Sequence, residues 1–384
     1  MHLFTVDSYG YISGELIRTP LYPLLLKTCS AIFGNHGMDA VVAIQTLCAL
    51  LAAILLVRSL RSLTPTPLWA QTAVFAVLAG PILLYSRVII TDTLAYALYL
   101  ATLACALRFM GAGKSGGWLI AAACLNILVR PQMAFALPVL GGLFLLKRKY
   151  LLLAVLCGAF AAAGLADRTY HKIHNGVFMN SGIGAVHMAR DLMYFSRPED
   201  QTLFAGGPHG KLMKDVFARI ENEKLSERFR GEATLSAYFT EISNQLAWNT
   251  LCDLYARQNP TAPQQDMIRF CKYVSGVMMP KYRAALPRLW LSKMRERAAV
   301  IAFALLLAAL PLFSAKGIVA QAVSFLAWVG LCNYLLVACS SCFGVRMDFY
   351  SETALALAAV IAALGWRNRA VAAARPQPVR NPVQ

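Results

Sequence analysis

The sequence predicts an all-α fold: a polytopic bundle of transmembrane helices that carries a mostly helical insertion on one side of the membrane. Of its 384 residues, 58% are hydrophobic and only 14% are charged, and the mean hydropathy is +0.54. Several apolar runs approach the about 20 residues that a helix needs to cross the hydrocarbon core of a bilayer. Lipid cannot satisfy open backbone groups, so these crossings must be helical.

About eight or nine crossings are expected from the apolar runs. The two runs that flank Arg130–Pro131 are separate crossings that meet at a polar corner, because proline stops a helix and arginine resists burial. The candidate crossings are 39–57, 67–86, 88–107, 118–129, 132–146, 150–166, 298–314, 317–339 and 350–366.

The basic residues sort by topology, which excludes nucleic acid as the partner that a net charge of +17 would otherwise indicate. Short connections between the crossings, together with the tail, hold twelve basic residues and no acidic residue. Such loops belong in the cytoplasm by the positive-inside rule. The alternation then places all 19 acidic residues on the far side of the membrane. The twelve basic residues are Arg58, Arg61, Arg108, Lys114, Lys147, Arg148, Lys149, Lys316, Arg367, Arg369, Arg375 and Arg380.

Five regions follow from this topology. In the first of them, the run 21–33 is expected to be an interfacial helix, because Lys27 interrupts it and prolines precede and open it. In the third, the basic and amphipathic stretch 281–298 is expected to lie on the membrane surface. The regions are 1–38, an external loop; 39–166, a transmembrane block; 167–297, a mostly helical extracytoplasmic segment; 298–366, C-terminal crossings; and 367–384, a disordered cytoplasmic tail.

Acidic and basic residues at the membrane border are the candidates for chemistry. Asp92 opens a long apolar helix and is expected either to act at a site or to serve, with Thr91, as an N-cap. Arg130 lies between two apolar runs, where a cation needs an anion: Asp92, or a phosphate delivered by a lipid. Asp7 is either a functional carboxylate or part of a solvated loop, and Arg346 beside Asp348 is either a second site cation or an ordinary loop ion pair.

No metal site is expected from the histidines or cysteines. His171 and His174 have helical spacing but no cysteine nearby in sequence, and Cys339 and Cys342 lack a second ligand pair. Cys252 and Cys271 could form a disulfide in an oxidising compartment.

The N-terminal part resembles the bacterial C-type (GT-C) membrane glycosyltransferases of the dolichyl-phosphate-mannose–protein mannosyltransferase superfamily, in its family 39-like branch. The matching segments are DSYGYISGE, RTPLYPLLLKTCSAIFG, VVAIQTLCALLAAILL, LAGPILLYSRVIITDTLAYALYLA and LNILVRPQMAFALPVL, in this order. Relatives have a transmembrane helix before the acidic loop, whereas six residues precede Asp7 here. We therefore expect either an upstream start or a truncated copy.

The resemblance implies an inverting glycosyltransferase, hexosyl or pentosyl, in the inner (plasma) membrane with its active site outside the cytoplasm. The donor would be a polyprenyl-phosphate sugar and the acceptor an envelope glycan, lipid or protein. Asp7 matches the family's catalytic base, and Asp92 matches an acid that positions donor or acceptor. Arg130, then Arg87 and Arg346, are candidates for the donor phosphate. Arg18, Tyr22 and Glu15 belong to the loop motif and are further substrate-binding candidates, although Arg18 and Tyr22 could instead fix the loop. No cofactor is implied with certainty, and a divalent cation stays open.

Two other functions remain open at this stage. A polymerase or ligase of lipid-linked oligosaccharides would also place arginines at an outer cavity, but would not require the N-terminal acidic motif. A transporter or flippase of lipid-linked sugars predicts paired halves and broken helices near the midplane. The acidic residues cluster at one face instead, which favours the transferase.

Overall fold

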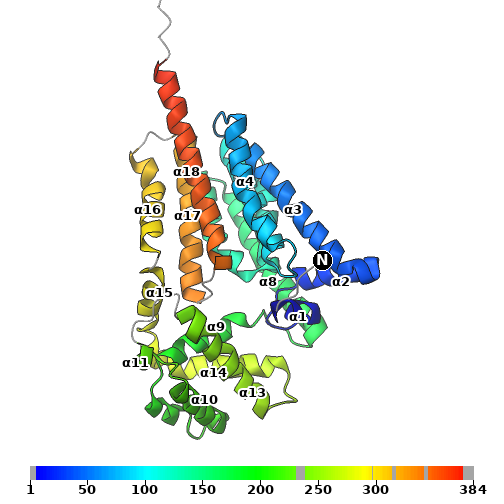
Figure 1. Ribbon diagram of the computed structural model, residues 1–384, viewed down its shortest axis with the longest axis vertical. Coiled ribbons are helices and arrows are strands. Elements are labelled where there is room, and N and C mark those ends of the chain that lie inside the picture. The colour runs from blue at the N-terminus through cyan, green and yellow to red at the C-terminus, as the bar shows by residue number, and fades with distance from the viewer. Residues whose placement is uncertain (1–5, 231–237, 296, 314–316, 341–344, 375–384) are drawn as a thin grey trace, which may run out of the picture.

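The computed structural model describes the chain except residues 1–5, 231–237, 296, 314–316, 341–344 and 375–384, and the side chains of a few further residues, Asp7 and Arg346 among them. The described residues form helices, with no strand among them, which confirms the all-α prediction for that part of the chain. A bundle of long helices carries a smaller helical body at one end (Figure 1). The sequence expectation of a bundle with an insertion therefore has a direct structural counterpart.

The bundle is built around α5 (Asp92–Ala112), whose side chains are buried along most of its length. Small and medium apolar residues let the neighbouring helices pack closely around it in one continuous core. The other bundle helices are α3 (Gly37–Leu60), α4 (Leu68–Tyr85), α6 (Gly116–Val129), η2 (Pro131–Phe135), α7 (Ala136–Leu146), α8 (Tyr150–Asn175), α16 (Ala298–Phe313), α17 (Ile318–Ser340) and α18 (Val345–Ala374).

Five described helical stretches are long and apolar enough to cross a membrane. They are Leu21–Leu60, Leu68–Tyr85, Asp92–Ala112, Tyr150–Asn175 and Ile318–Val337. The expected crossings around Arg130 and at 298–314 appear as shorter apolar helices, Gly116–Val129, Pro131–Leu146 and Ala298–Ala309. The break after Val129 lies where the sequence predicts a corner, because Arg130 leaves the helix with extended backbone angles and Pro131 follows it.

The insertion has a hydrophobic core of its own, in which the apolar faces of short helices meet. Its α10 is strongly amphipathic, with Leu212, Met213, Val216, Phe217 and Ile220 buried on one side. The helices of the insertion are α9 (Ile183–Tyr194), η3 (Pro198–Phe204), α10 (Gly210–Asn222), α11 (Glu227–Arg230), η4 (Tyr238–Ser243), η5 (Gln245–Cys252), α13 (Asp253–Gln258), α14 (Gln264–Tyr282) and α15 (Leu286–Arg295).

The stretch 281–298, expected on the membrane surface, wedges between the insertion and the bundle. Its α15 contacts α17, and Trp290 packs against the cores of both bodies. Lys293 is fully buried and lies 3.5 Å from Asp191. The amphipathic stretch therefore forms a protein interface with both the insertion and the bundle. Its cation Lys293 is buried there beside the Asp191 carboxylate.

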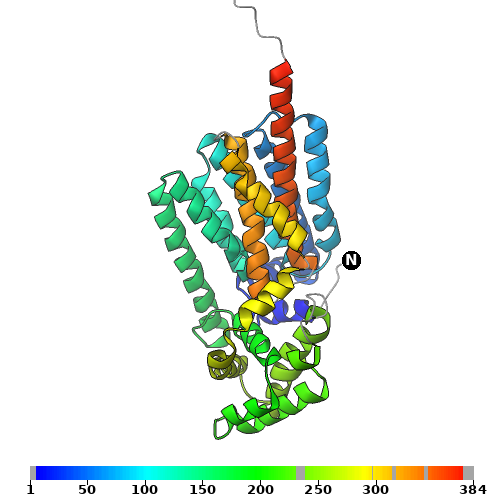
Figure 2. The same ribbon diagram turned by 90° about the vertical axis from the view of Figure 1, so that its left-hand side faces the viewer.

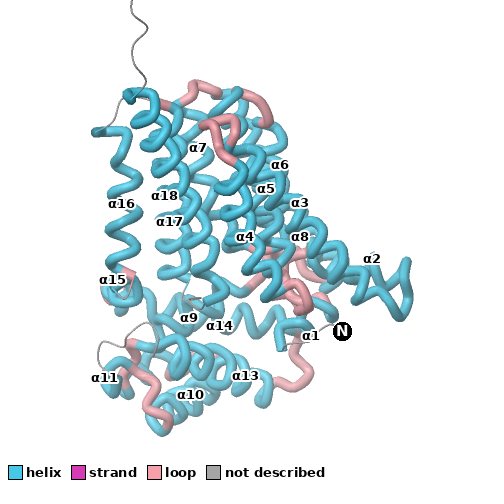
Figure 3. The backbone as a smooth tube through the Cα atoms, turned by 45° about the horizontal axis from the view of Figure 1, so that its top comes forward, coloured by secondary structure: helices cyan, strands magenta, loops and turns pink. Residues whose placement is uncertain are grey.

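The N-terminal helices lie at the insertion end of the bundle (Figures 1 and 2). They are α1 (Val6–Ser13), α2 (Leu21–Phe33) and η1 (Gly34–His36), after which α3 begins. Helix α1 sits between the bundle and the insertion, and α2 extends to one side at an angle to α3 (Figures 1 and 3). The loops that join α3 to α4, α5 to α6 and α7 to α8 lie at the opposite end (Figure 3). The two ends thus separate the acid-free basic loops from the acid-bearing segments.

Candidate functional site

A buried ion pair joins α5 to the corner after α6. Asp92 is the first residue of α5, and Arg130 is the residue at which α6 ends. The guanidinium Nη1 of Arg130 donates to Oδ1 of Asp92. The Asp92 side chain is only 2% exposed and that of Arg130 only 11%. This is the partner that the sequence analysis suggested for Arg130, and burial makes each charge depend on the other.

Tyrosines from α5 and α18 close one side of the pair. Tyr350 lies beside Arg130 and within electrostatic range of Asp92. Its backbone carbonyl accepts a hydrogen bond of 2.8 Å from the Tyr99 hydroxyl, and the two rings pack edge to face. Tyr96 packs against Tyr350 as well, and its hydroxyl lies 3.3 Å from Thr353 Oγ1. Helix α18 is thereby held against the ion pair although it is far away in sequence.

The N-terminal segment closes the other side. The Tyr11 hydroxyl lies 3.1 Å from Oγ1 of Thr91, the residue before Asp92. The Arg18 guanidinium stacks over the Tyr11 ring, 4.5 Å from its centroid, and one of its nitrogens lies 3.5 Å from the Tyr11 hydroxyl. The Thr19 hydroxyl donates to the carbonyl of Val129, next to Arg130, at 2.7 Å. The acidic loop motif is thus attached to both members of the ion pair through their sequence neighbours.

Tyr22 fixes the base of this arrangement. It is fully buried, its hydroxyl donates to Oε1 of Gln45 at 3.2 Å, and its ring packs edge to face on Tyr11. The amide of Gln45 donates in turn to the carbonyls of Ser86 and Val88, at 2.6 and 3.2 Å. Those carbonyls belong to the turn between α4 and α5, so α2 and α3 together hold the approach to Asp92. Through these contacts Tyr22 holds the N-terminal loop in place.

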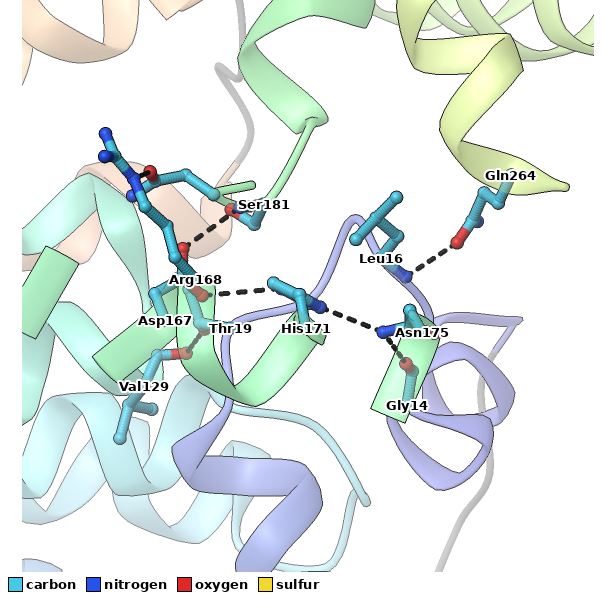
Figure 4. A network of polar contacts seen from close by, with 11 residues as sticks. Gly14, Leu16, Thr19, Val129, Asp167, Arg168, His171, Asn175, Ser181 and Gln264 are labelled. Atoms are coloured by element: carbon cyan, nitrogen blue, oxygen red, sulfur yellow. Dashed lines mark hydrogen bonds and ion pairs between the residues drawn. The ribbon is translucent and has the colours of Figure 1, made fainter. Parts of the chain in front are cut away.

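The insertion forms hydrogen bonds with the same N-terminal segment (Figure 4). The backbone NH of Leu16 donates to Oε1 of Gln264 on α14 at 2.6 Å, and its carbonyl accepts from the NH of Gly182 before α9 at 3.3 Å. On the α8 side, Asn175 donates to the carbonyl of Gly14 at 3.3 Å. Gly14 has φ +68°, a left-handed conformation that glycine adopts without strain.

The site candidates are brought together only in part. Asp92, Arg130, Arg18 and Tyr22 lie in one connected cluster. Glu15 and Arg18 converge over Gly10, where an added Cβ would lie 2.7 Å from Glu15 Oε2 and 3.0 Å from Arg18 Nε. Arg87 is exposed on the turn before α5.

Two candidates lie outside the described side chains. The backbone of Asp7 falls in the first turn of α1, and that of Arg346 in the first turn of α18. Both helix starts are at the insertion end of the bundle, which is the end that holds the ion pair (Figure 1).

The expectation of an N-cap at the start of α5 is wrong. Thr91 occupies the cap position but makes no side-chain capping bond, because its hydroxyl faces Tyr11 instead. Asp92 uses its carboxylate on Arg130. The side chains at the start of α5 therefore contact other segments instead of capping their own helix. Such a departure from local preference is typical of a functional site.

Among the described residues, no group of three or more histidines, cysteines and acids could hold a metal ion. His171 is fully buried, with Nε2 3.4 Å from Oδ1 of Asp167 and Nδ1 3.0 Å from Nδ2 of Asn175. These contacts give it a structural role under the N-terminal segment.

Sequence reasoning missed the tyrosines. Tyr96 and Tyr99 follow Asp92 by four and seven residues, a spacing that places all three on one face of α5. That signal is readable from the sequence. The arrival of Tyr350 against the same face depends on packing between distant helices and has no local signature.

The fold and the cluster together define a class: a polytopic helical membrane protein with an ion pair buried where an N-terminal loop and an insertion cover one end of the bundle. Residues 18–166 match the family model of dolichyl-phosphate-mannose-protein mannosyltransferases. In residues 18–166 the chain is therefore similar to membrane glycosyltransferases of the GT-C type, as the resemblance implies. The match spans α2 to most of α8, includes Arg18, Tyr22, Asp92 and Arg130, and begins after Asp7. Neither a curated protein nor a solved structure matches the chain.

Proposed function

We propose that the protein transfers a sugar from a polyprenyl-phosphate donor to a glycan, lipid or protein acceptor at the outer face of the inner membrane. The observation that carries the proposal is the Asp92–Arg130 pair, buried at the bundle end that the N-terminal loop covers. Burying two charges inside the protein is costly, which supports a functional role for the pair. The anion that Arg130 would meet in turnover is the phosphate of the lipid-linked sugar.

Arg130 is proposed to bind the donor phosphate, and Asp92 is proposed to position the Arg130 guanidinium. A guanidinium has five N–H donors in a planar fork, so the contacts of Arg130 with Asp92 and Tyr350 are compatible with binding a phosphate as well. Asp92 is hydrogen-bonded to that fork and fixes its direction. As the bond between the anomeric carbon and the phosphate oxygen breaks, the leaving phosphate takes the electron pair, and Arg130 stabilises the added charge.

Asp7 is proposed as the general base. An acceptor hydroxyl would give its proton to the Asp7 carboxylate as its oxygen attacks the anomeric carbon from the face opposite the phosphate, so configuration inverts. Arg18 and Tyr11 would hold the loop against the start of α5, and Glu15 would line the same approach. Arg87 and Arg346 are proposed as further contacts for the donor at the mouth. A divalent cation is not needed for these steps and stays open.

The test is transfer by membranes that contain the full chain and receive a radiolabelled polyprenyl-phosphate sugar. Asp7→Asn should lower the rate by at least about a hundredfold, the usual scale for a lost general base. Asp39→Asn is the matched control, because Asp39 is an exposed carboxylate on α3 near the same end. Equal rates for both variants would exclude Asp7 as the base.

The same pair of variants separates the transferase from a transporter. A flippase of lipid-linked sugars needs no base, so Asp7→Asn would leave transport of labelled lipid across vesicle membranes unchanged. Loss of transfer without loss of membrane insertion favours the transferase.

A further inference from the structure

A cavity of about 310 Å³ lies at the junction of α8 with the insertion, outside the ion-pair cluster. Two of its lining side chains are cations, Arg168 in the C-terminal part of α8 and Lys272 on α14. Asn180 and Ser181 add an amide and a hydroxyl, and none of the lining residues is acidic. A concave site with two cations and neutral donors suits an anion, and the Arg and Lys pair suits a phosphate group in particular.

The carboxylate next to Arg168 in the sequence is already engaged within the protein. Asp167 precedes Arg168, but its side chain is buried, accepts a 3.0 Å hydrogen bond from the NH of Ser181 and faces His171 (Figure 4). Arg168 is oriented through its Nε, which donates to Oδ1 of Asn180. That contact uses one edge of the guanidinium, and the Nη atoms can take two oxygens of one phosphate.

The cavity lies where the apolar part of α8 gives way to charged residues. Arg168 follows directly on the apolar part of α8, one of the helices long enough to cross the membrane. Phe178, another lining residue, is 53% exposed, so a large apolar ring stands beside the cations. An exposed apolar ring next to cations suits a ligand that has both an apolar and an anionic part.

One segment connects the cavity with the ion-pair cluster. Gly182, in the cavity wall, donates to the carbonyl of Leu16. Two and three residues later, Arg18 stacks on Tyr11 and Thr19 bonds to the neighbour of Arg130. The wall of the cavity and the ion-pair cluster are therefore joined through residues 16–19.

We infer that this cavity binds a phosphate monoester carried by a membrane-borne acceptor and so holds the acceptor beside the N-terminal loop. The assignment to the acceptor rests on the proposed function, whereas binding of a lipid phosphate does not. The ligand is a lipid whose headgroup is a phosphate. The two cations bind the phosphate dianion, and Phe178 contacts the apolar part of the lipid.

The experiment measures thermal unfolding of the purified full chain in neutral detergent while dihexanoyl phosphatidic acid is titrated. A ligand that binds only the folded state raises the unfolding midpoint with concentration. Arg168→Ala combined with Lys272→Ala should weaken the apparent affinity by about tenfold or more. Lys211→Ala is the control, an exposed lysine on α10 of the same insertion.

A second variant blocks the cavity without changing charge. A Cβ added at Gly184 would meet nothing within 4 Å, so Gly184→Leu should fold, project into the cavity and abolish the shift. Dihexanoyl phosphatidylcholine should give no shift, and inorganic phosphate should bind more weakly than the lipid phosphate.

Three results would overturn the inference: no shift with phosphatidic acid, an undiminished shift in both cavity variants, or tighter binding of inorganic phosphate than of the lipid. The first two remove the site, and the third removes its membrane-borne ligand. Because the readout is binding, failure here is distinct from failure of sugar transfer, which the Asp7 variants measure.

Discussion

At the scale of single residues, Arg130 and Asp92 form a unit whose members cannot be replaced separately without cost. Asp92 is buried and Arg130 nearly so, and their surroundings are mainly aromatic and apolar. The sequence identified both residues and their possible pairing, because a charge between apolar runs needs a counterion. It did not identify the aromatic side of the site, which depends on Tyr350 arriving from α18.

Arg130→Met and Asp92→Leu are each expected to destabilise the protein by about 3–5 kcal/mol, because each leaves an uncompensated buried charge. The double variant should recover much of that loss, since both charges are gone, while remaining unable to transfer sugar. Unfolding in detergent measures the first effect and the membrane transfer assay the second. A double variant less stable than both single variants would contradict a mutually compensating pair.

His209 predicts a pH dependence of the insertion. Burial lowers the pKa of this histidine, whose ring packs 5.1, 5.4 and 6.2 Å from the rings of Phe270, Tyr273 and Tyr255. The unfolded chain, with an ordinary pKa of about 6.5, then takes up the proton first as pH falls. The stabilising contribution is complete above about pH 6.5 and is lost as pH falls through the lower folded pKa.

His209→Phe should therefore flatten the slope of the unfolding midpoint below about pH 6.5, because phenylalanine suits the aromatic site and does not titrate. His36→Gln serves as the control, since the side chain of His36 is 87% exposed. If the unfolding midpoint of His209→Phe still falls with pH as steeply as that of the wild type, groups other than His209 cause the pH dependence.

At the scale of elements, the close approach of α9 to α14 positions both the N-terminal segment and the cavity. Gly182 allows it: an added Cβ would lie 2.2 Å from the end of the buried Ile268 side chain. The same glycine bonds to Leu16 through its NH, so displacement of α9 would move the loop motif as well.

Gly182→Ala is accordingly expected to lower the stability of the insertion by about 1–3 kcal/mol through overpacking. Gly184→Ala, two residues later on α9, should have little effect, because its Cβ enters open space. Hydrogen exchange of the α9 and α14 amides would report the difference. Equal protection in the two variants would show that Ile268 gives way.

At the scale of the whole molecule, hydropathy and charge predicted the most. The order of bundle helices, the place of the insertion and the separation of basic loops from acidic segments follow from local composition. The wedge formed by α15 does not, because its buried Lys293 finds Asp191 a hundred residues away. Hydropathy also left the number of crossings open, since α6, α7 and α16 are short.

Cys252 and Cys271 test the orientation of the molecule. Both thiols are buried in the core of the insertion, and their mutual hydrogen bond, together with burial, raises the pKa of Cys271. If the insertion faces an oxidising compartment, the two thiols should transfer two electrons and two protons to a disulfide-exchange oxidant and form a bond. Mass spectrometry after alkylation, with and without reduction, should show this pair protected. If the chain is unfolded without reduction and both cysteines are then alkylated, no disulfide was present. That result would contradict an extracytoplasmic insertion.

The central claim is that the end of the bundle holding Asp92 and Arg130 transfers a sugar under the N-terminal loop. The most direct test is mass spectrometry of envelope glycans from strains that carry a deletion, the gene in its native context, Asp7→Asn or Arg130→Gln. The wild-type gene should add one sugar mass to a glycan, lipid or protein, and both variants should reach the membrane without adding it. Normal addition of that sugar by both variants would contradict the account.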